Sequence, residues 1–291
     1  MNPLLILTLL VGVFAETSHA QDQRIGDLDG ATITAGESTY TEELAESENT
    51  SIANHLTLNY FGIFFGPSLQ SPTSYQPDGY GIPDKDRPIV FRNFLNLGYN
   101  LTDELAVGGT FYWTWQPVLG HQGLVQDPFL KVSHNSIFRF GDLNLYGDLR
   151  VHFPASQWSR DNNMQFGVQS VQALTYSVGS TNLLLGLVAS VRADSYGDRS
   201  FGNDMEFYLA PNVNYQITQT LAFTLLYEFF ANKGEGLQSY GFRGYGSDIE
   251  PGLAWDATPQ LTLNPYLHLP VSGSVSLNST SFGMMINYAL I

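Results

Sequence analysis

Hydrophobic and polar residues alternate cleanly over the last eleven positions of the chain. Every second side chain there is apolar, and this set comprises Phe282, Met284, Ile286, Tyr288 and Leu290. Because successive side chains of an extended strand point to opposite faces, the pattern predicts a strand with one apolar face. About ten earlier segments show the same two-residue period.

The clearest earlier segment covers residues 143–153, where leucine, valine and phenylalanine alternate with polar side chains. A segment over 128–138 is the weakest. Another over 164–178 keeps the length of a strand but blurs the phase, which a β-bulge would explain. The pattern as a whole predicts about twelve strands within residues 52–291.

The predicted links between strands alternate in length. Short links fall at 100–104, 139–142, 179–182, 218–220 and 256–260, and longer ones at 67–88, 117–127, 154–163, 194–204, 231–246 and 270–280. Such an alternation is typical of antiparallel barrels that cross an outer membrane, with turns at the periplasmic end and loops at the extracellular end. An even number of strands then predicts that both termini lie in the periplasm.

Two all-β architectures fit this pattern, a soluble sandwich and a closed transmembrane barrel. A sandwich exposes its polar face to water and covers it with charge, but only 13% of the residues of the chain are charged. The polar face is rich in Gly, Asn, Thr, Ser and Tyr, and aromatic residues lie near strand ends, as in the interfacial girdles of membrane barrels. The region after about residue 52 therefore resembles the outer-membrane β-barrel class of diderm bacteria, which implies an up-and-down antiparallel barrel.

The N-terminal region has a different composition. Residues 1–20 combine an apolar run with Ser18-His19-Ala20, which is typical of a signal peptide, and a buried helix is the alternative. Residues 21–51 are polar, with eight acidic residues and one basic residue before position 51. We interpret this segment as a disordered periplasmic tail, and a plug inside the barrel is the alternative.

Other features of the composition narrow the choice of class. No later stretch approaches the roughly 18 apolar residues of a membrane-spanning helix, which excludes a helical inner-membrane protein. The chain has no cysteine, so an exported fold gains nothing from disulfides. Its net charge of −15 makes nucleic acid an implausible partner.

Charged residues on the predicted inward faces are the first candidates for a functional site. They are Asp148, Arg150, His152, Arg192, Glu206, Glu228, Asp248 and Glu250, with the bases early in the chain and the acids late. One interpretation is a structural network in which these groups pair across a narrow lumen. The other is a constriction whose transverse field selects small polar solutes. Bulky inward residues such as Phe61, Phe65, Tyr112, Tyr208, Phe230 and Tyr266 would narrow the lumen further.

The last strand has two predicted roles. It should close the barrel against the first strand, and its outward residues Phe282, Met284, Ile286, Tyr288 and Leu290 should act as the membrane insertion signal. The expected partners are therefore outer-membrane lipid, the barrel-assembly machinery and small solutes, while the oligomeric state stays open.

One enzymatic alternative rests on His134-Asn135-Ser136. This tripeptide resembles the His and Ser of outer-membrane phospholipase A, which implies a histidine that activates a serine. The Asn-Gly that should follow is Ile137-Phe138 here. The six histidines lack metal-ligand spacing, and no phosphate loop is present, so we expect no metal, no cofactor and no enzyme. The sequence thus favours a narrow passive channel, with a non-conducting structural or surface-interaction barrel as the alternative.

Overall fold

The computed structural model describes residues 55–70, 89–117, 122–197, 203–234, 243–271, 275–277 and 279–291. The predicted signal peptide and acidic segment, residues 1–51, lie outside these ranges. Within them, no helix is long and apolar enough to cross a bilayer.

Almost all of the described chain is strand. The elements are β1 (Leu56–Ser68), β2 (Val90–Asn100), β3 (Leu105–Gln116), β4 (Gln122–Val125), β5 (Phe129–Phe140), β6 (Leu143–His152), α2 (Gln157–Asp161), β7 (Met164–Ser177), β8 (Leu183–Tyr196), β9 (Asn203–Gln216), β10 (Leu221–Gly234), β11 (Arg243–Thr258), β12 (Leu261–Pro270) and β13 (Ser281–Ala289).

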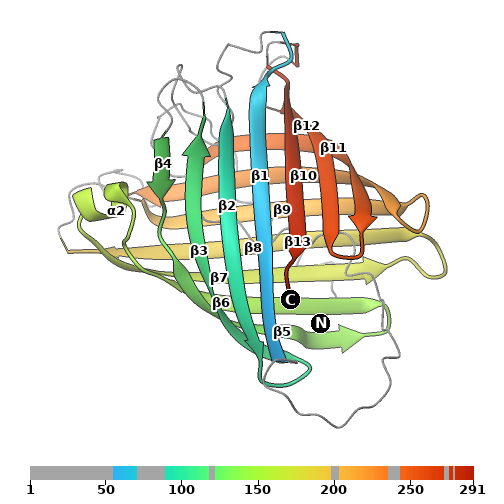
Figure 1. Ribbon diagram of the computed structural model, residues 1–291, viewed down its shortest axis with the longest axis horizontal. Coiled ribbons are helices and arrows are strands. Elements are labelled where there is room, and N and C mark those ends of the chain that lie inside the picture. The colour runs from blue at the N-terminus through green and yellow to red at the C-terminus, as the bar shows by residue number, and fades with distance from the viewer. Residues whose placement is uncertain are drawn as a thin grey trace.

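Twelve of these strands form a closed antiparallel barrel, which confirms the predicted fold class. Each pairs with its neighbour in the chain, and β13 pairs with β1 to close the ring. Residue Tyr60 lies opposite Tyr288, and the amide of Leu290 donates to the carbonyl of Leu58 at 2.8 Å. In Figure 1, β1 and β2 run upright in the front wall, while β6 to β8 run nearly horizontally behind them. This crossing of the front and back walls follows from the tilt of barrel strands.

The thirteenth strand is the short β4, which falls inside the link predicted over 117–127. Both β4 and β5 pair with β3, one after the other along its length. Together β4 and β5 therefore take the place of one strand that is interrupted at Gln126-Asp127-Pro128. Pro128 has no amide hydrogen for the ladder. The carboxylate of Asp127 instead accepts from the amides of Ala155 and Ser156, at 2.9 and 2.8 Å, and from the hydroxyl of Ser159. This break anchors α2 beside the end of the barrel.

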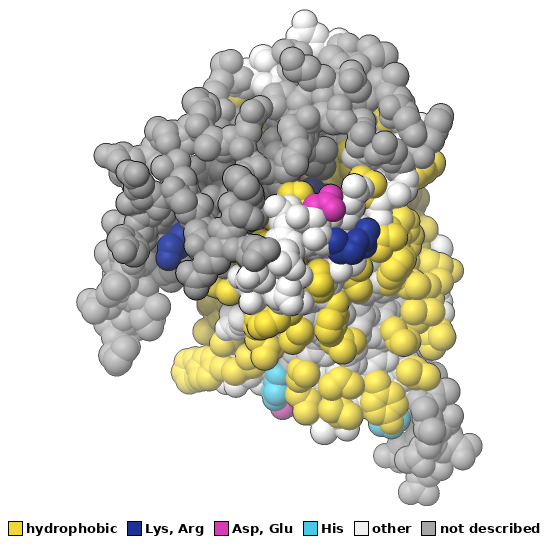
Figure 2. Space-filling view, turned by 90° about the vertical axis from the view of Figure 1, so that its left-hand side faces the viewer, with side chains coloured by type: hydrophobic (Ala, Val, Ile, Leu, Met, Phe, Trp, Pro, Cys, Tyr) yellow, Lys and Arg dark blue, Asp and Glu magenta, His cyan; other side chains and the backbone are white. Residues whose placement is uncertain are grey.

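The two faces of the barrel wall differ sharply in exposure. Leu149 is 53% exposed and Arg150, the next residue, only 1%. Large exposed apolar side chains recur on the same outward phase around the ring: Leu97, Phe111, Leu130, Val132, Val191, Phe223, Leu253 and Leu267. Figure 2 shows how apolar side chains spread over one side of the wall. A continuous apolar exterior of this kind is suited to contact with lipid.

The proposed insertion residues lie on this exterior at the closing strand. Phe282, Tyr288 and Leu290 are exposed, and Met284 and Ile286 are partly exposed. Their outward orientation agrees with the predicted apolar face, whereas their role in membrane insertion stays a prediction. The described chain starts and ends at the barrel end that carries the short turns.

Candidate functional site

The predicted charged residues all sit on the inward phase of their strands. Seven of the eight are buried, and Glu206 is half-buried. Strand register places several of them directly beside one another in a row that runs across the wall: Lys131, Arg150, Gln169, Arg192 and Glu206. The basic residues thus form a patch over β5 to β8, and the row passes into acidic residues at β9.

Arg150 is the centre of the basic patch. Its Nε and Nη2 atoms donate to the two carboxylate oxygens of Asp148, both at 2.8 Å, and Tyr146 donates its hydroxyl to the same carboxylate at 2.9 Å. The guanidinium also lies 4.9 Å from the centre of the Phe129 ring. Its Nη1 atom is buried without a hydrogen-bond partner. A buried guanidinium with one unused nitrogen has a donor available for a further anionic group.

Neighbouring polar groups hold the rest of this wall in place. Arg192 donates its Nε hydrogen to Asp194 at 2.8 Å. The ring of His152 lies 3.0 Å from the amide oxygen of Gln169, and Gln169 in turn donates to Ser190 at 3.4 Å. Because these contacts join residues of the same strand or of adjacent strands, they fix the side chains against the wall.

Carboxylates gather on the facing part of the barrel. Glu228 accepts a 2.5 Å hydrogen bond from Tyr208 and lies opposite Asp248 in the pairing of β10 with β11. The imidazole of His268, on β12, lies between Glu250, at 2.9 Å from Nδ1, and Asp248, at 3.3 Å from Nε2. Both oxygens of Asp248 are buried and accept no hydrogen bond. Two carboxylates, Asp248 and Glu250, therefore share one histidine on this wall.

The predicted pairing of charges across the lumen stays a prediction, and the structure defines several local pairs. Asp148 pairs with Arg150 and Arg192 with Asp194 on one strand, and His268 pairs with Asp248 and Glu250 on the neighbouring strand. Residues two positions apart on a strand lie on the same face, so their side chains are close enough to form an ion pair without spanning the lumen.

Sequence reasoning missed four contributors to this interior. They are Lys131, Asp194, Gln169 and His268. Asp194 and His268 follow the same inward phase as Arg192 and Tyr266, so strict counting along each strand would have found them. Lys131 lies in the segment with the weakest alternation, and Gln169 in the one with the blurred phase.

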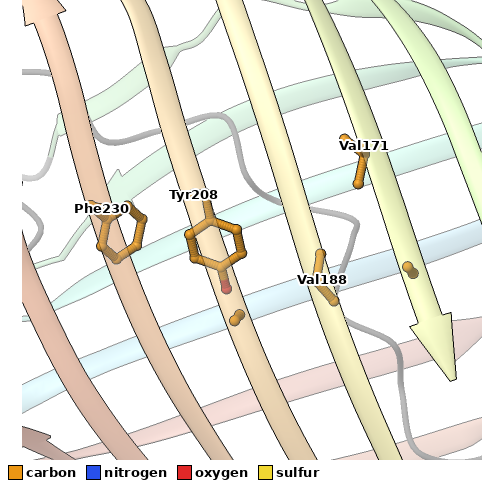
Figure 3. Packing of buried hydrophobic residues seen from close by; sticks show 6 residues of the cluster. Val171, Val188, Tyr208 and Phe230 are labelled. Carbon is orange, nitrogen blue, oxygen red and sulfur yellow. The ribbon is translucent and has the colours of Figure 1, made fainter. Parts of the chain in front are cut away.

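Apolar and aromatic side chains narrow the interior further. One cluster joins Val171, Ala173, Val188, Tyr208, Ala210 and Phe230 on β7 to β10, and Figure 3 shows four of them projecting to the same side of successive strands. A second joins Phe61, Ile63, Phe94 and Tyr112 on β1 to β3. Phe65 packs against both clusters. Since β1 and β8 lie six strands apart in a ring of twelve, Phe65 links opposite walls.

Comparisons with known proteins agree on the fold. No protein-family model matches the chain, and no curated protein matches it. An outer membrane channel from Pseudomonas putida F1 has a TM-score of 0.55 to it at 13% identity, covering 85% of this chain and 100% of that chain. The fold is that of an outer-membrane β-barrel. The predicted class is thereby confirmed.

Two further solved structures resemble this barrel more distantly. The NanC porin has a TM-score of 0.49 at 10% identity, covering 80% of this chain and 98% of that chain. The KdgM porin in complex with disordered oligogalacturonate has a TM-score of 0.46 at 10% identity, covering 81% of this chain and 99% of that chain. The likeness in fold rests on the Pseudomonas putida structure.

The His134-Asn135-Ser136 segment does not form a nucleophile and base in this barrel. It lies where β5 bulges away from β6, between His134 and Phe138. The Nδ1 atom of His134 lies 3.2 Å from the backbone amide of Ser136, and its Nε2 atom lies 3.7 Å from Glu104. Both ring nitrogens are therefore directed at groups other than the serine hydroxyl. This geometry gives the hydrolase alternative no support.

The described residues contain no group of three or more His, Cys, Asp or Glu side chains with the geometry to hold a metal ion. The carboxylates near His268 belong to the charged interior described above. What the site offers chemically is an interior lined by buried charged side chains, with arginine–aspartate pairs on β6 and β8 and a cluster of carboxylates around His268 on β10 to β12.

Proposed function

We propose that this barrel is a narrow outer-membrane channel through which small polar solutes or ions cross passively. The observation that carries the proposal is the number of charged side chains buried on the inward face, with Arg150 and Arg192 beside Asp148 and Asp194 on β6 and β8, and Glu228, Asp248 and Glu250 on β10 and β11. Charged side chains at a constriction select permeating solutes. The solved structure with the most similar fold among those compared above is itself titled an outer membrane channel, which supports the proposal.

The width of the passage follows from the burial of its lining. A wide aqueous pore leaves inward side chains exposed, whereas Arg150, His152 and Asp248 are at most 1% exposed. Twelve strands also enclose less space than the 16 to 18 strands of open porins. The channel we propose therefore conducts weakly.

A non-conducting structural or surface-interaction barrel is the second candidate. The local pairing of Asp148 with Arg150 favours it, because paired charges fill a barrel interior without any need for a solute. The two functions differ in one direct measurement, the current through the purified full chain in a planar lipid bilayer.

The experiment compares wild type with Arg150→Ala. The channel proposal expects small discrete conductance steps in wild type and a shift of ion selectivity toward cations in the variant, because a positive charge leaves the passage. Arg139→Ala is the matched control, since Arg139 is exposed at the turn end of β5. A wild-type bilayer without conductance steps contradicts the channel and favours the structural barrel.

A further inference from the structure

Two oppositely charged side chains in the interior have unused bonding capacity. Arg150 has a buried Nη1 atom without a hydrogen-bond partner, and Asp248 has two buried oxygens that accept no hydrogen bond, with His268 at ion-pair distance. Each residue is 1% exposed. Burying a charged atom without a hydrogen-bond partner costs free energy, unless another group, such as a bound solute, pairs with it.

These two side chains lie on nearly opposite walls of the barrel. β6, which carries Arg150, is separated from β11, which carries Asp248, by five steps around the ring in one direction and seven in the other. In a ring of twelve strands six steps would be diametrically opposite. Both residues lie on the inward face of these strands.

The register also places them at the same level along the barrel axis. The row of paired residues that starts at Arg150 reaches Asn232 on β10 and then Arg243, at the loop end of β11. Followed the other way, the row descends through Gly108 to Thr57, near the turn end of β1. The row is therefore slanted, and it rises toward the loop end as it approaches β11.

The amount of slant identifies the residue level with Arg150. Strands of such barrels are tilted by about 35–45°, so a row perpendicular to them climbs by roughly one to one and a half residues for each strand crossed. Over the five steps to β11 the climb is about five to seven residues. Counting back from Arg243 toward the turn end gives the stretch from Asp248 to Glu250.

From this placement we propose that the lumen selects small zwitterions, solutes that carry a carboxylate and an ammonium group a few atoms apart. The inference rests on the proposed channel function and names its substrate class. A carboxylate pairs with the Arg150 guanidinium, while an ammonium group pairs with the carboxylates of Asp248 and Glu250. A simple anion or a simple cation carries one of these two groups and can therefore pair on one wall only.

The test uses two isomers of nearly equal size, one zwitterionic and one without formal charge. Glycine is a zwitterion, and glycolamide has the same atoms without formal charge. Proteoliposomes that contain the full-length wild-type barrel are placed in isosmotic solutions of each compound, and swelling is followed by light scattering. We expect glycine to enter roughly fivefold faster, which corresponds to about 1 kcal/mol in barrier height.

Variants locate the selectivity. In Arg150→Gln and in Asp248→Asn the ratio of the glycine rate to the glycolamide rate should fall toward one, and in Arg139→Gln it should stay at the wild-type value. Since removing one member of a buried pair can disturb folding, the double variant Asp148→Asn with Arg150→Gln removes both members together. The electrophoretic mobility of unheated protein shows whether each variant is folded.

Different results would contradict the selection of zwitterions and the channel function itself. Entry of both isomers into wild-type vesicles at equal rates, or faster entry of glycolamide, overturns zwitterion selection and leaves a channel. Entry of neither isomer, together with a silent planar bilayer, overturns the channel and the selection with it.

Discussion

At the scale of single residues, the interior of the barrel depends on one aromatic side chain that reaches two walls. Phe65 packs against the cluster on β7 to β10 and the cluster on β1 to β3, and the guanidinium of Arg92 lies 4.8 Å from its ring centre. The inward orientation of Phe65 follows from the alternation of β1. Its contacts with both clusters do not, because they need the far wall to be in place.

Replacing Phe65 with alanine should widen the narrowest part of the passage. The side chain would no longer bridge the two clusters, so we expect the single-channel conductance in a planar bilayer to rise by roughly twofold. Phe64→Ala is the control, because Phe64 faces outward and packs against Phe91 and Phe282. Equal conductance in wild type and Phe65→Ala would show that the constriction lies elsewhere.

At the scale of elements, predictions succeeded where the two-residue period was unbroken. The segment predicted over 143–153 is β6 (Leu143–His152), and that over 164–178 is β7 (Met164–Ser177). The strands between residues 117 and 138 were harder to predict. The short β4, the break at Pro128 and the bulge after His134 each interrupt the alternation of apolar and polar residues there. Loops were also predicted too long, since β10 and β11 extend past the last apolar residue of their clear alternation.

The outward face of a strand should tolerate charge only near its ends. Val191 lies near the middle of β8 and faces outward, and Phe140 ends β5. We expect Val191→Arg to lower the free energy of unfolding by about 2–4 kcal/mol and Phe140→Arg by about 0–1 kcal/mol, because the cost of a lipid-facing charge depends on depth. Equilibrium unfolding in urea with phospholipid vesicles measures both values. Similar losses for the two variants would contradict a lipid-facing exterior.

At the scale of the whole molecule, closure depends on β13 fitting between β1 and β12. Gly283 lies opposite Phe65 on one side and Tyr266 on the other. A β-carbon at Gly283 would overlap the ring of Tyr266, which covers this glycine. The absent side chain at Gly283 therefore makes room for an aromatic ring at the seam of the barrel.

Gly283→Val should impair closure by crowding this seam. We expect a loss of about 1–3 kcal/mol in the free energy of unfolding, typical of overpacked sites, and a smaller folded fraction after refolding into vesicles, measured by gel mobility without heating. Gly123→Val is the matched control, because a β-carbon at Gly123 meets nothing within 4 Å. If both variants refold as wild type does, Tyr266 has room to move and the seam is not tightly packed.

The sequence by itself determined the strands, the inward or outward side of most residues and the order of pairing around the barrel. Side-chain alternation is a local property of an extended chain, and short links force sequential strands to pair. Only the tertiary structure decided which charges oppose one another. The level that we infer for Arg150 with Asp248 and Glu250 results from a stagger accumulated over five strand pairings, and the contacts of Phe65 with both clusters need two walls brought together. Neither is encoded in any one strand.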